Sequence, residues 1–234
     1  MSDNASASLM KSLLLMPVVA FRSLIESLQK LSWFCRSRRF LRIGLCYYAQ
    51  YLWLDPYIAC RRYLERWDAD EVQPVYGETP FATLEDIATR VELKETDVLY
   101  ELGCGRGLTV FWFNHFYGCR SVGIELVPHF VKRGNRIVER LNIDRVTFRE
   151  ENILEADLSE ATVVYFFGTA FSDLAVARIV ERFETQLKPG TRIASVSFPL
   201  QDFADRPHAY TLKETFTAQF LWGEGTIYIQ EKNA

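Results

Sequence analysis

The amino-acid sequence predicts an α/β fold in which helices cover a mostly parallel sheet that ends in an antiparallel hairpin. Two observations carry this prediction. After about residue 80, short apolar runs alternate with segments of helical periodicity, which is the rhythm of βαβ units. Near the C-terminus, two strand-like segments, Tyr210–Trp222 and Thr226–Glu231, are joined through Gly223, Glu224 and Gly225, which favours a hairpin.

Length and charge divide the chain into two expected parts. Its 234 residues, 49% of them hydrophobic, suffice for one substantial domain with an extension. The net charge of -3 argues against a general nucleic-acid binder. Residues 1–70 carry 10 basic and 6 acidic side chains, whereas residues 71–234 carry 17 and 24. We therefore expect an N-terminal helical extension over 1–70 and a main domain over 71–234.

Three helices are expected in this extension. Apolar residues recur at helical spacing between Val18 and Phe34, and a second helical stretch runs from about Ser37 to Leu54. Asp55–Pro56 suits a cap and first turn of a third helix that ends near Trp67. We expect these helices to pack on each other and on the main domain.

The alternative for the extension is contact with an anionic membrane surface or with a partner protein. The residues that suggest it are Arg36, Arg38, Arg39, Arg42, Trp33, Phe34, Phe40 and Tyr47. No apolar stretch reaches the roughly 18 residues of a membrane-spanning helix, and no secretory signal is convincing. The five cysteines lack C-x-x-C spacing, and the three histidines are scattered, so neither a disulfide framework nor a metal site is indicated. A cytoplasmic location, with possible membrane association, is expected.

The main domain alternates between the two element types in order. Strands are expected over Asp97–Glu101, Arg120–Glu125, Arg145–Arg149, Thr162–Phe167 and Thr191–Ser197. Helices are expected over Phe81–Val91, Thr109–Tyr117, Val131–Leu141 and Asp173–Leu187.

A glycine-rich turn follows the first expected strand. Glu101 ends that strand, and Gly103, Gly105 and Gly107 alternate before the next helix. Glycines at such a turn let the backbone bend sharply and approach a nucleoside-containing ligand closely. A dinucleotide motif would have glycine where this chain has Leu108, so the pattern favours S-adenosylmethionine over a nicotinamide cofactor.

Two later strand ends complete an adenosine site. Glu125 lies about 20 residues after the first glycine, where an acid can accept hydrogen bonds from ribose hydroxyls. After the third strand, Asn152 offers a carbonyl acceptor for the adenine amino group, and Ile153 can pack on the adenine ring. We therefore expect S-adenosyl-L-methionine as the cofactor.

A segment upstream of the glycine turn narrows the expected function. VYGETPF at Val75–Phe81 resembles a segment of the non-SET histone-lysine methyltransferases, the disruptor-of-telomeric-silencing family. Similarity continues through Glu101–Gly107, Val163–Asp173, Glu181–Ser195 and Phe220–Gln230, so that it covers about residues 72–231. The mitochondrial seven-strand lysine methyltransferases, which also have an N-terminal hydrophobic helix, are a related comparison. The resemblance implies a Rossmann-like seven-strand methyltransferase sheet.

The resemblance also implies roles for individual residues. Tyr76 and Thr79 would contact the methionine end of the cofactor, and Glu101 and Gly103 would hold its amino group and backbone. The residues implied to line a narrow lysine channel are Phe171, Trp222 and Tyr228. Core packing is the alternative reading of these three aromatic side chains. Glu78 is a candidate for orientation, and no general base is indicated.

The chain departs from that family at the end of the fourth strand. Phe167–Gly168 replaces a pair of asparagines. The histone enzymes also carry a basic nucleosome-binding region, whereas this chain has an acidic main domain and a different helical extension, which argues against a nucleosome substrate. We expect a protein-lysine N-methyltransferase that acts on a protein and not on nucleic acid. The alternatives are a small-molecule or RNA methyltransferase of the same fold, or a non-catalytic cofactor-binding module.

Overall fold

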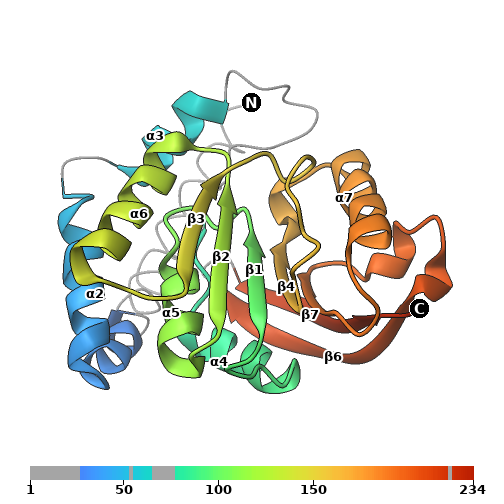
Figure 1. Ribbon diagram of the computed structural model, residues 1–234, viewed down its shortest axis with the longest axis horizontal. Coiled ribbons are helices and arrows are strands. Elements are labelled where there is room, and N and C mark those ends of the chain that lie inside the picture. Colours follow the sequence, from blue (N-terminus) through green and yellow to red (C-terminus); the bar gives the residue numbers. More distant parts are fainter. Residues whose placement is uncertain (1–26, 53–54, 65–76, 221–222) are drawn as a thin grey trace, which may run out of the picture.

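The computed structural model describes residues 27–52, 55–64, 77–220 and 223–234. A seven-stranded sheet with the order β3-β2-β1-β4-β5-β7-β6 forms its centre (Figure 1). The first five strands of that order are parallel, and β7 runs antiparallel to both of its neighbours. The strands are β1 (Val98–Leu102), β2 (Arg120–Glu125), β3 (Val146–Glu150), β4 (Val163–Phe167), β5 (Arg192–Val196), β6 (Tyr210–Phe220) and β7 (Gly223–Lys232). The predicted Rossmann-like sheet with its C-terminal hairpin is confirmed.

Helices cover both faces of this sheet. Along the main domain they are α4 (Phe81–Arg90), α5 (Leu108–Tyr117), α6 (Pro128–Leu141) and α7 (Asp173–Gln186). Alternate strand residues supply the two cores, since Leu99 and Tyr165 face the core that holds α4, α5 and α6. Tyr100 and Phe166 face the opposite core, which holds α7. The central strands are buried on both sides, as expected for parallel strands between helical layers.

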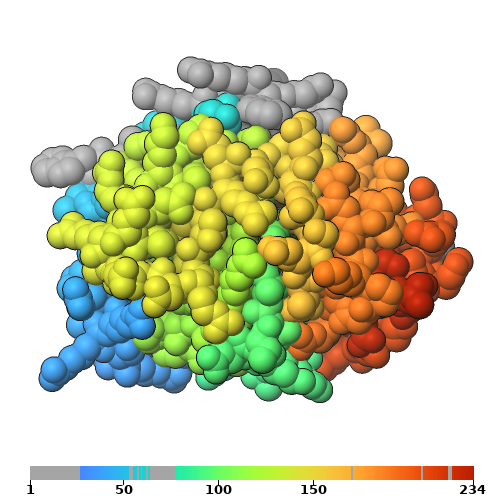
Figure 2. Space-filling model, viewed as in Figure 1, coloured from blue at the N-terminus to red at the C-terminus, as the bar shows by residue number. Residues whose placement is uncertain are grey.

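The described N-terminal helices share the first of these cores. Residues 27–35 are helical, and α2 (Arg38–Ala49) begins after Ser37, whose hydroxyl caps it by accepting a 3.3 Å hydrogen bond from the Phe40 amide. The ring of Trp33 meets that of Trp112 in α5 edge to face, with centroids 5.3 Å apart. Figure 2 shows this segment, in blue, lying against the main domain. For the described part of the extension, the expected packing on the main domain is confirmed.

This packing corrects the list of residues proposed to meet a membrane. Trp33, Phe34, Phe40 and Tyr47 are all buried in the core, so their rings face protein and not lipid. Arg36, Arg38, Arg39 and Arg42 do lie on the surface. The third expected helix is α3 (Pro56–Leu64) within the described residues. None of the helices in the part of the chain that the structure describes has the length and apolar character needed to cross a bilayer.

Two element boundaries differ from expectation for clear local reasons. Helix α6 begins three residues early because Pro128, with its fixed φ, occupies its first turn. The glycines assigned to the hairpin loop belong to β7, since Gly223 pairs with Phe220 and Gly225 pairs with Ala218. The loop prediction at 223–225 was therefore wrong. The connection lies between Phe220 and Gly223, outside the described residues.

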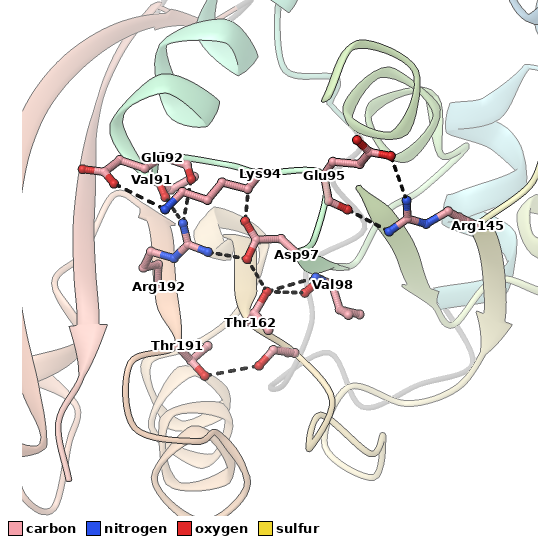
Figure 3. Close-up of polar contacts among 11 residues, drawn as sticks. Val91, Glu92, Lys94, Glu95, Asp97, Val98, Arg145, Thr162, Thr191 and Arg192 are labelled. Carbon is pink, nitrogen blue, oxygen red and sulfur yellow. Dashed lines mark hydrogen bonds and ion pairs between the residues drawn. The ribbon is translucent and has the colours of Figure 1, made fainter. Parts of the chain in front are cut away.

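A polar network joins the amino ends of β1, β4 and β5 (Figure 3). The Asp97 carboxylate accepts hydrogen bonds from Thr162 at 2.7 Å, from the Lys94 amide at 2.7 Å and from the Arg192 guanidinium at 2.5 Å. Arg192 also donates to the carbonyl oxygen of Val91. Burial raises the pKa of Asp97, but the hydrogen bonds from Thr162, Arg192 and Lys94 outweigh it and leave that pKa below its ordinary value. This network holds the sheet at the edge opposite the glycine turn.

Candidate functional site

The candidate site lies where parallel strands end at one edge of the sheet. The chain leaves β1 at Leu102, β2 at Glu125 and β3 at Glu150, and all three carboxyl ends share that edge. The strand order reverses between β1 and β4, which is the place where open α/β sheets bind ligands. The structure therefore brings together the strand ends to which the sequence assigned the cofactor.

The glycine turn after β1 has the backbone that only glycine adopts easily. Gly103, Gly105 and Gly107 have φ values of 74°, 54° and 80°. The amide of Gly103 donates to the Ile124 carbonyl oxygen at 2.9 Å, which fixes the turn against β2. A Cβ at position 107 would lie 2.1 Å from Phe148 Cε1, so this position needs glycine for packing. A Cβ at position 103 would meet only Ile153 Cδ1, at 3.9 Å.

Glu125 ties the glycine turn to the end of β2. Its Oε2 accepts from the Gly105 amide at 2.7 Å, and its Oε1 accepts from the Val127 amide at 2.8 Å. Burial raises the pKa of this carboxyl, while the backbone amides of Val127 and Gly105 oppose that rise. The Leu126 amide is a third backbone donor to this carboxylate. Since a carboxylate offers about four acceptor positions, about one stays open for a ligand.

Glu101 presents a buried oxygen whose hydrogen bonding is incomplete. Its Oε2 has no hydrogen-bond partner among the described residues, although the side chain is almost fully enclosed. Burial holds the pKa of Glu101 well above its ordinary value, a hydrogen bond from Thr109 opposes this, and the negative charges of Glu125 and Glu78 add to it. A buried acceptor of this kind is costly unless a ligand donates to it.

The third strand end contributes Asn152 and Ile153. Ile153 is buried and stands beside Gly103. Asn152 Oδ1 accepts from the Leu154 amide at 3.0 Å, so part of its hydrogen-bonding capacity closes its own turn. The second lone pair of that oxygen remains for a ligand.

The segment before α4 reaches the same region. Thr79 is buried, and its hydroxyl lies 2.6 Å from the hydroxyl of Tyr165 in β4, which pairs in register with Glu101. Glu78 is ion-paired with Arg106 of the glycine turn and with Lys30. Tyr76, the remaining site residue assigned to this segment, lies outside the described residues.

The proposed channel residues are less closely grouped. Phe171 packs against Phe166 with ring centroids 5.6 Å apart, at the edge of the core that holds α7. Tyr228 is half-buried in β7, paired in register with Ser195 of β5. No ring contact joins Phe171 and Tyr228 in the described structure. Trp222 lies outside the described residues, so the channel stays a prediction.

Sequence reasoning missed three residues at this site. Arg106 lies within the glycine turn, Tyr47 comes from α2, and Tyr165 comes from the middle of β4. The position of Arg106 inside the motif was the one available signal. The contacts of the two tyrosines depend on packing between distant segments, which no local pattern reveals.

These features fit S-adenosylmethionine. The unpaired Glu101 oxygen suits the ammonium group of its methionine end. The loose surroundings of Gly103, where an added Cβ would make one ordinary contact with Ile153, suit a close approach of the ligand to the backbone. The remaining acceptor position of Glu125 suits a ribose hydroxyl. Residues from three strand ends contribute to this fit. The glycine motif alone would therefore not identify the cofactor.

The fold and this site define a class of protein. The structure of an RNA methyltransferase from Salinibacter ruber, in complex with S-adenosyl-L-homocysteine, is similar with a TM-score of 0.56 and 29% sequence identity. The similarity covers 67% of this chain and 94% of that one. The protein is an S-adenosylmethionine-dependent methyltransferase of the seven-strand class.

Within this class, the sequence matches include lysine methyltransferases. The family model of the ANTKMT methyltransferase domain matches residues 101–206. A protein-lysine N-methyltransferase of Saccharolobus islandicus is 28% identical over 129 residues, which are 54% of this chain and 78% of that protein. A histone-lysine N-methyltransferase of Dictyostelium discoideum, specific for H3 lysine-79, is 27% identical over 138 residues. That match covers 53% of this chain and 8% of the Dictyostelium protein.

Proposed function

We propose that this methyltransferase transfers its methyl group to lysine side chains of a protein. The observation that carries the proposal is the similarity to the Saccharolobus protein-lysine N-methyltransferase, which extends along 78% of that protein. The match to the ANTKMT methyltransferase domain supports it. So does the likeness of VYGETPF to the non-SET lysine methyltransferases, since its residue Thr79 lies at the candidate site.

The proposal gives each site residue a task in holding the cofactor. Glu101 accepts from the ammonium group, and the backbone of Gly103 and Gly105 lies along the ligand. Glu125 accepts from the ribose hydroxyls. At the adenine end, Ile153 packs on the ring and Asn152 accepts from the amino group. At the methionine end, the proposed contacts are Tyr76 and Thr79.

The reaction needs an aligned nucleophile and a dry site. When bound, the cofactor would supply an electrophilic methyl group, whose bond to sulfur breaks as the new nitrogen–carbon bond forms and a neutral thioether leaves. A lysine with a reference pKa of about 10.4 must first lose its proton. An aromatic channel formed by Phe171, Trp222 and Tyr228 would favour the neutral amine by excluding water. Alignment then supplies much of the rate acceleration.

A second acceptor class follows from the Salinibacter similarity. That protein is an RNA methyltransferase. Its 29% identity to this chain is about the same as the 28% identity of the Saccharolobus protein-lysine N-methyltransferase. The acidic excess over residues 71–234, with 17 basic and 24 acidic side chains, disfavours a polyanionic substrate. Lysine therefore remains the preferred acceptor over RNA.

Contact of the N-terminal extension with a membrane surface remains a separate prediction. Arg38, Arg39 and Arg42 are exposed in α2, and Leu45 in the same helix is 63% exposed. Basic and apolar groups on one helix could meet an anionic surface. Flotation with anionic vesicles tests this, and a chain that stays at the bottom of the gradient removes the prediction.

Calorimetry with S-adenosylmethionine and a Gly103→Arg protein tests the site directly. The wild-type chain should bind, and the arginine side chain should fill the space beside Ile153 and prevent binding. A Gly103→Arg protein that stays folded and binds as tightly as wild type would refute this placement of the site.

A further inference from the structure

A polar cluster joins the N-terminal helices to the cofactor turn. Its centre is Glu78, whose Oε1 accepts from the hydroxyl of Tyr47 in α2 and from the guanidinium of Arg106. Its Oε2 accepts from Lys30 at 3.0 Å, in the helix formed by residues 27–35. One carboxylate therefore receives donors from two N-terminal helices and from the glycine turn.

Arg106 is held on its other side by aromatic rings. Its guanidinium carbon lies 4.7 Å from the ring centre of Tyr47 and 4.8 Å from that of Tyr51. Cation–π contacts of this kind favour one orientation of the guanidinium plane. Arg106 stands between Gly105, whose amide donates to Glu125, and Gly107, the residue that precedes α5. Fixing Arg106 therefore restricts the part of the turn that is hydrogen-bonded to Glu125, the residue proposed to bind the ribose.

Tyr51 and its neighbour Gln50 also contact helix α6. The guanidinium of Arg133 lies 4.5 Å from the ring centre of Tyr51 and donates to the Gln50 carbonyl oxygen. The side chain of Gln50 donates back to the Arg133 carbonyl oxygen at 3.3 Å. Helix α6 begins three residues after Glu125, the last residue of β2. The end of α2 thus contacts elements on both sides of the proposed ribose site.

Burial makes these contacts matter more than ordinary surface ion pairs. The side chains of Glu78 and Arg106 are 13% and 11% exposed, respectively. Interactions between charges that water screens poorly are stronger than surface pairs, and removing one partner leaves the other charge poorly compensated. The positions of Glu78 and of the neighbouring Thr79 are consequently sensitive to the N-terminal helices.

We propose that Tyr47 and Lys30 are positioning residues of the cofactor site, which act through Glu78 on Arg106 and the glycine turn. The N-terminal helices then belong to the binding apparatus for S-adenosylmethionine in addition to covering the core. This inference rests on the assignment of the cofactor to the glycine turn.

The test compares Tyr47→Phe with Ile43→Val in the full-length chain. Tyr47→Phe keeps the ring but removes the donor to Glu78, whereas Ile43→Val removes packing from the same helix and leaves the polar cluster intact. Tyr47→Phe should raise the Kd for S-adenosylmethionine about three- to tenfold, the effect of one lost hydrogen bond. Ile43→Val should leave that Kd unchanged at equal folded fraction. Glu78→Gln should weaken binding further, because it removes the charge that Lys30 and Arg106 share.

The split between kinetic constants adds a readout that loss of stability would not produce. Tyr47→Phe should raise KM for the cofactor with a smaller change in kcat, and Arg106→Lys, which keeps the charge but loses the planar group, should do the same. Equal Kd values for wild type and Tyr47→Phe would overturn the inference, as would equal weakening by Ile43→Val. A wild-type chain that does not bind the cofactor would instead overturn the site assignment itself.

Discussion

Thr79 and Tyr165 join their hydroxyl groups across 2.6 Å, between the segment before α4 and the centre of β4. Both side chains are buried, and burial raises the pKa of Tyr165 above its ordinary value, so its hydroxyl is neutral at working pH. Because β4 pairs with β1 so that Tyr165 stands beside Glu101, this hydrogen bond places Thr79 next to the proposed ammonium site.

Tyr165→Phe should therefore affect both stability and binding. The Thr79 hydroxyl loses its partner, which should lower the free energy of unfolding by about 1–2 kcal/mol. The Kd for S-adenosylmethionine should rise as well, because Thr79 is no longer held. Urea denaturation and calorimetry measure the two effects.

The matched control for that change is Tyr210→Phe. Its hydroxyl is also buried and donates to the Val180 carbonyl oxygen at 3.2 Å, within the core that holds α7. It should cost similar stability without changing cofactor affinity. Equal affinity loss in both variants would show that the effect of Tyr165→Phe is not local.

Glu101→Gln should separate stability from binding. Since burial raises the pKa of Glu101, the ionised carboxylate is penalised in the folded chain without ligand. That penalty is absent below the ordinary glutamate pKa of about 4.3 and grows as pH rises through the raised folded value. Glu101→Gln should thus leave the ligand-free protein equally or more stable at neutral pH, while lowering cofactor affinity by at least about tenfold. Binding to the wild type should strengthen as pH rises above the ordinary glutamate pKa, because the ligand's ammonium group favours the ionised carboxylate, and the variant should lack that trend. A parallel trend in the variant would contradict the role of Glu101.

The glycines of the turn should respond differently to alanine. At Gly103 an added Cβ would make only an ordinary contact with Ile153, so Gly103→Ala should cost only the strain of its positive φ, about 1–2 kcal/mol. At Gly107 the Cβ would overlap Phe148 in addition, so Gly107→Ala should destabilise the chain more. Thermal denaturation ranks the two variants, and a Gly107→Ala protein as stable as Gly103→Ala would contradict the packing account.

Asp97→Asn should destabilise the sheet without affecting catalysis. The change weakens bonds from Thr162 and Arg192 at the edge opposite the site, for an expected loss of about 2–4 kcal/mol. Because the folded pKa of Asp97 is lowered, its contribution is fully present above the unfolded value of about 3.9 and is lost as pH falls through the folded value. The difference in free energy of unfolding between wild type and variant should therefore shrink as the pH is lowered in a series of denaturation experiments. At neutral pH, kcat per folded molecule should be the same for both proteins.

The sequence predicted those parts of the site that depend on strand ends. Glu101, Gly103 and Glu125 could be placed because parallel strands deliver their carboxyl ends to one edge and the glycine pattern marks the turn. The contact of Tyr47 with Glu78 could not, since those residues are 31 positions apart and meet only through helix packing. The hairpin was recognised but its loop misplaced, because Gly223–Gly225 continues the ladder with β6.

The central claim is that lysine is the methyl acceptor. The most direct measurement follows labelled methyl from S-adenosylmethionine into a cell lysate with the wild-type chain, with Gly103→Arg as the inactive control, and identifies the labelled residue by amino-acid analysis after hydrolysis. We predict label in methylated lysine with wild type and none above background with Gly103→Arg. Label confined to RNA, lipid or small molecules would contradict the assignment.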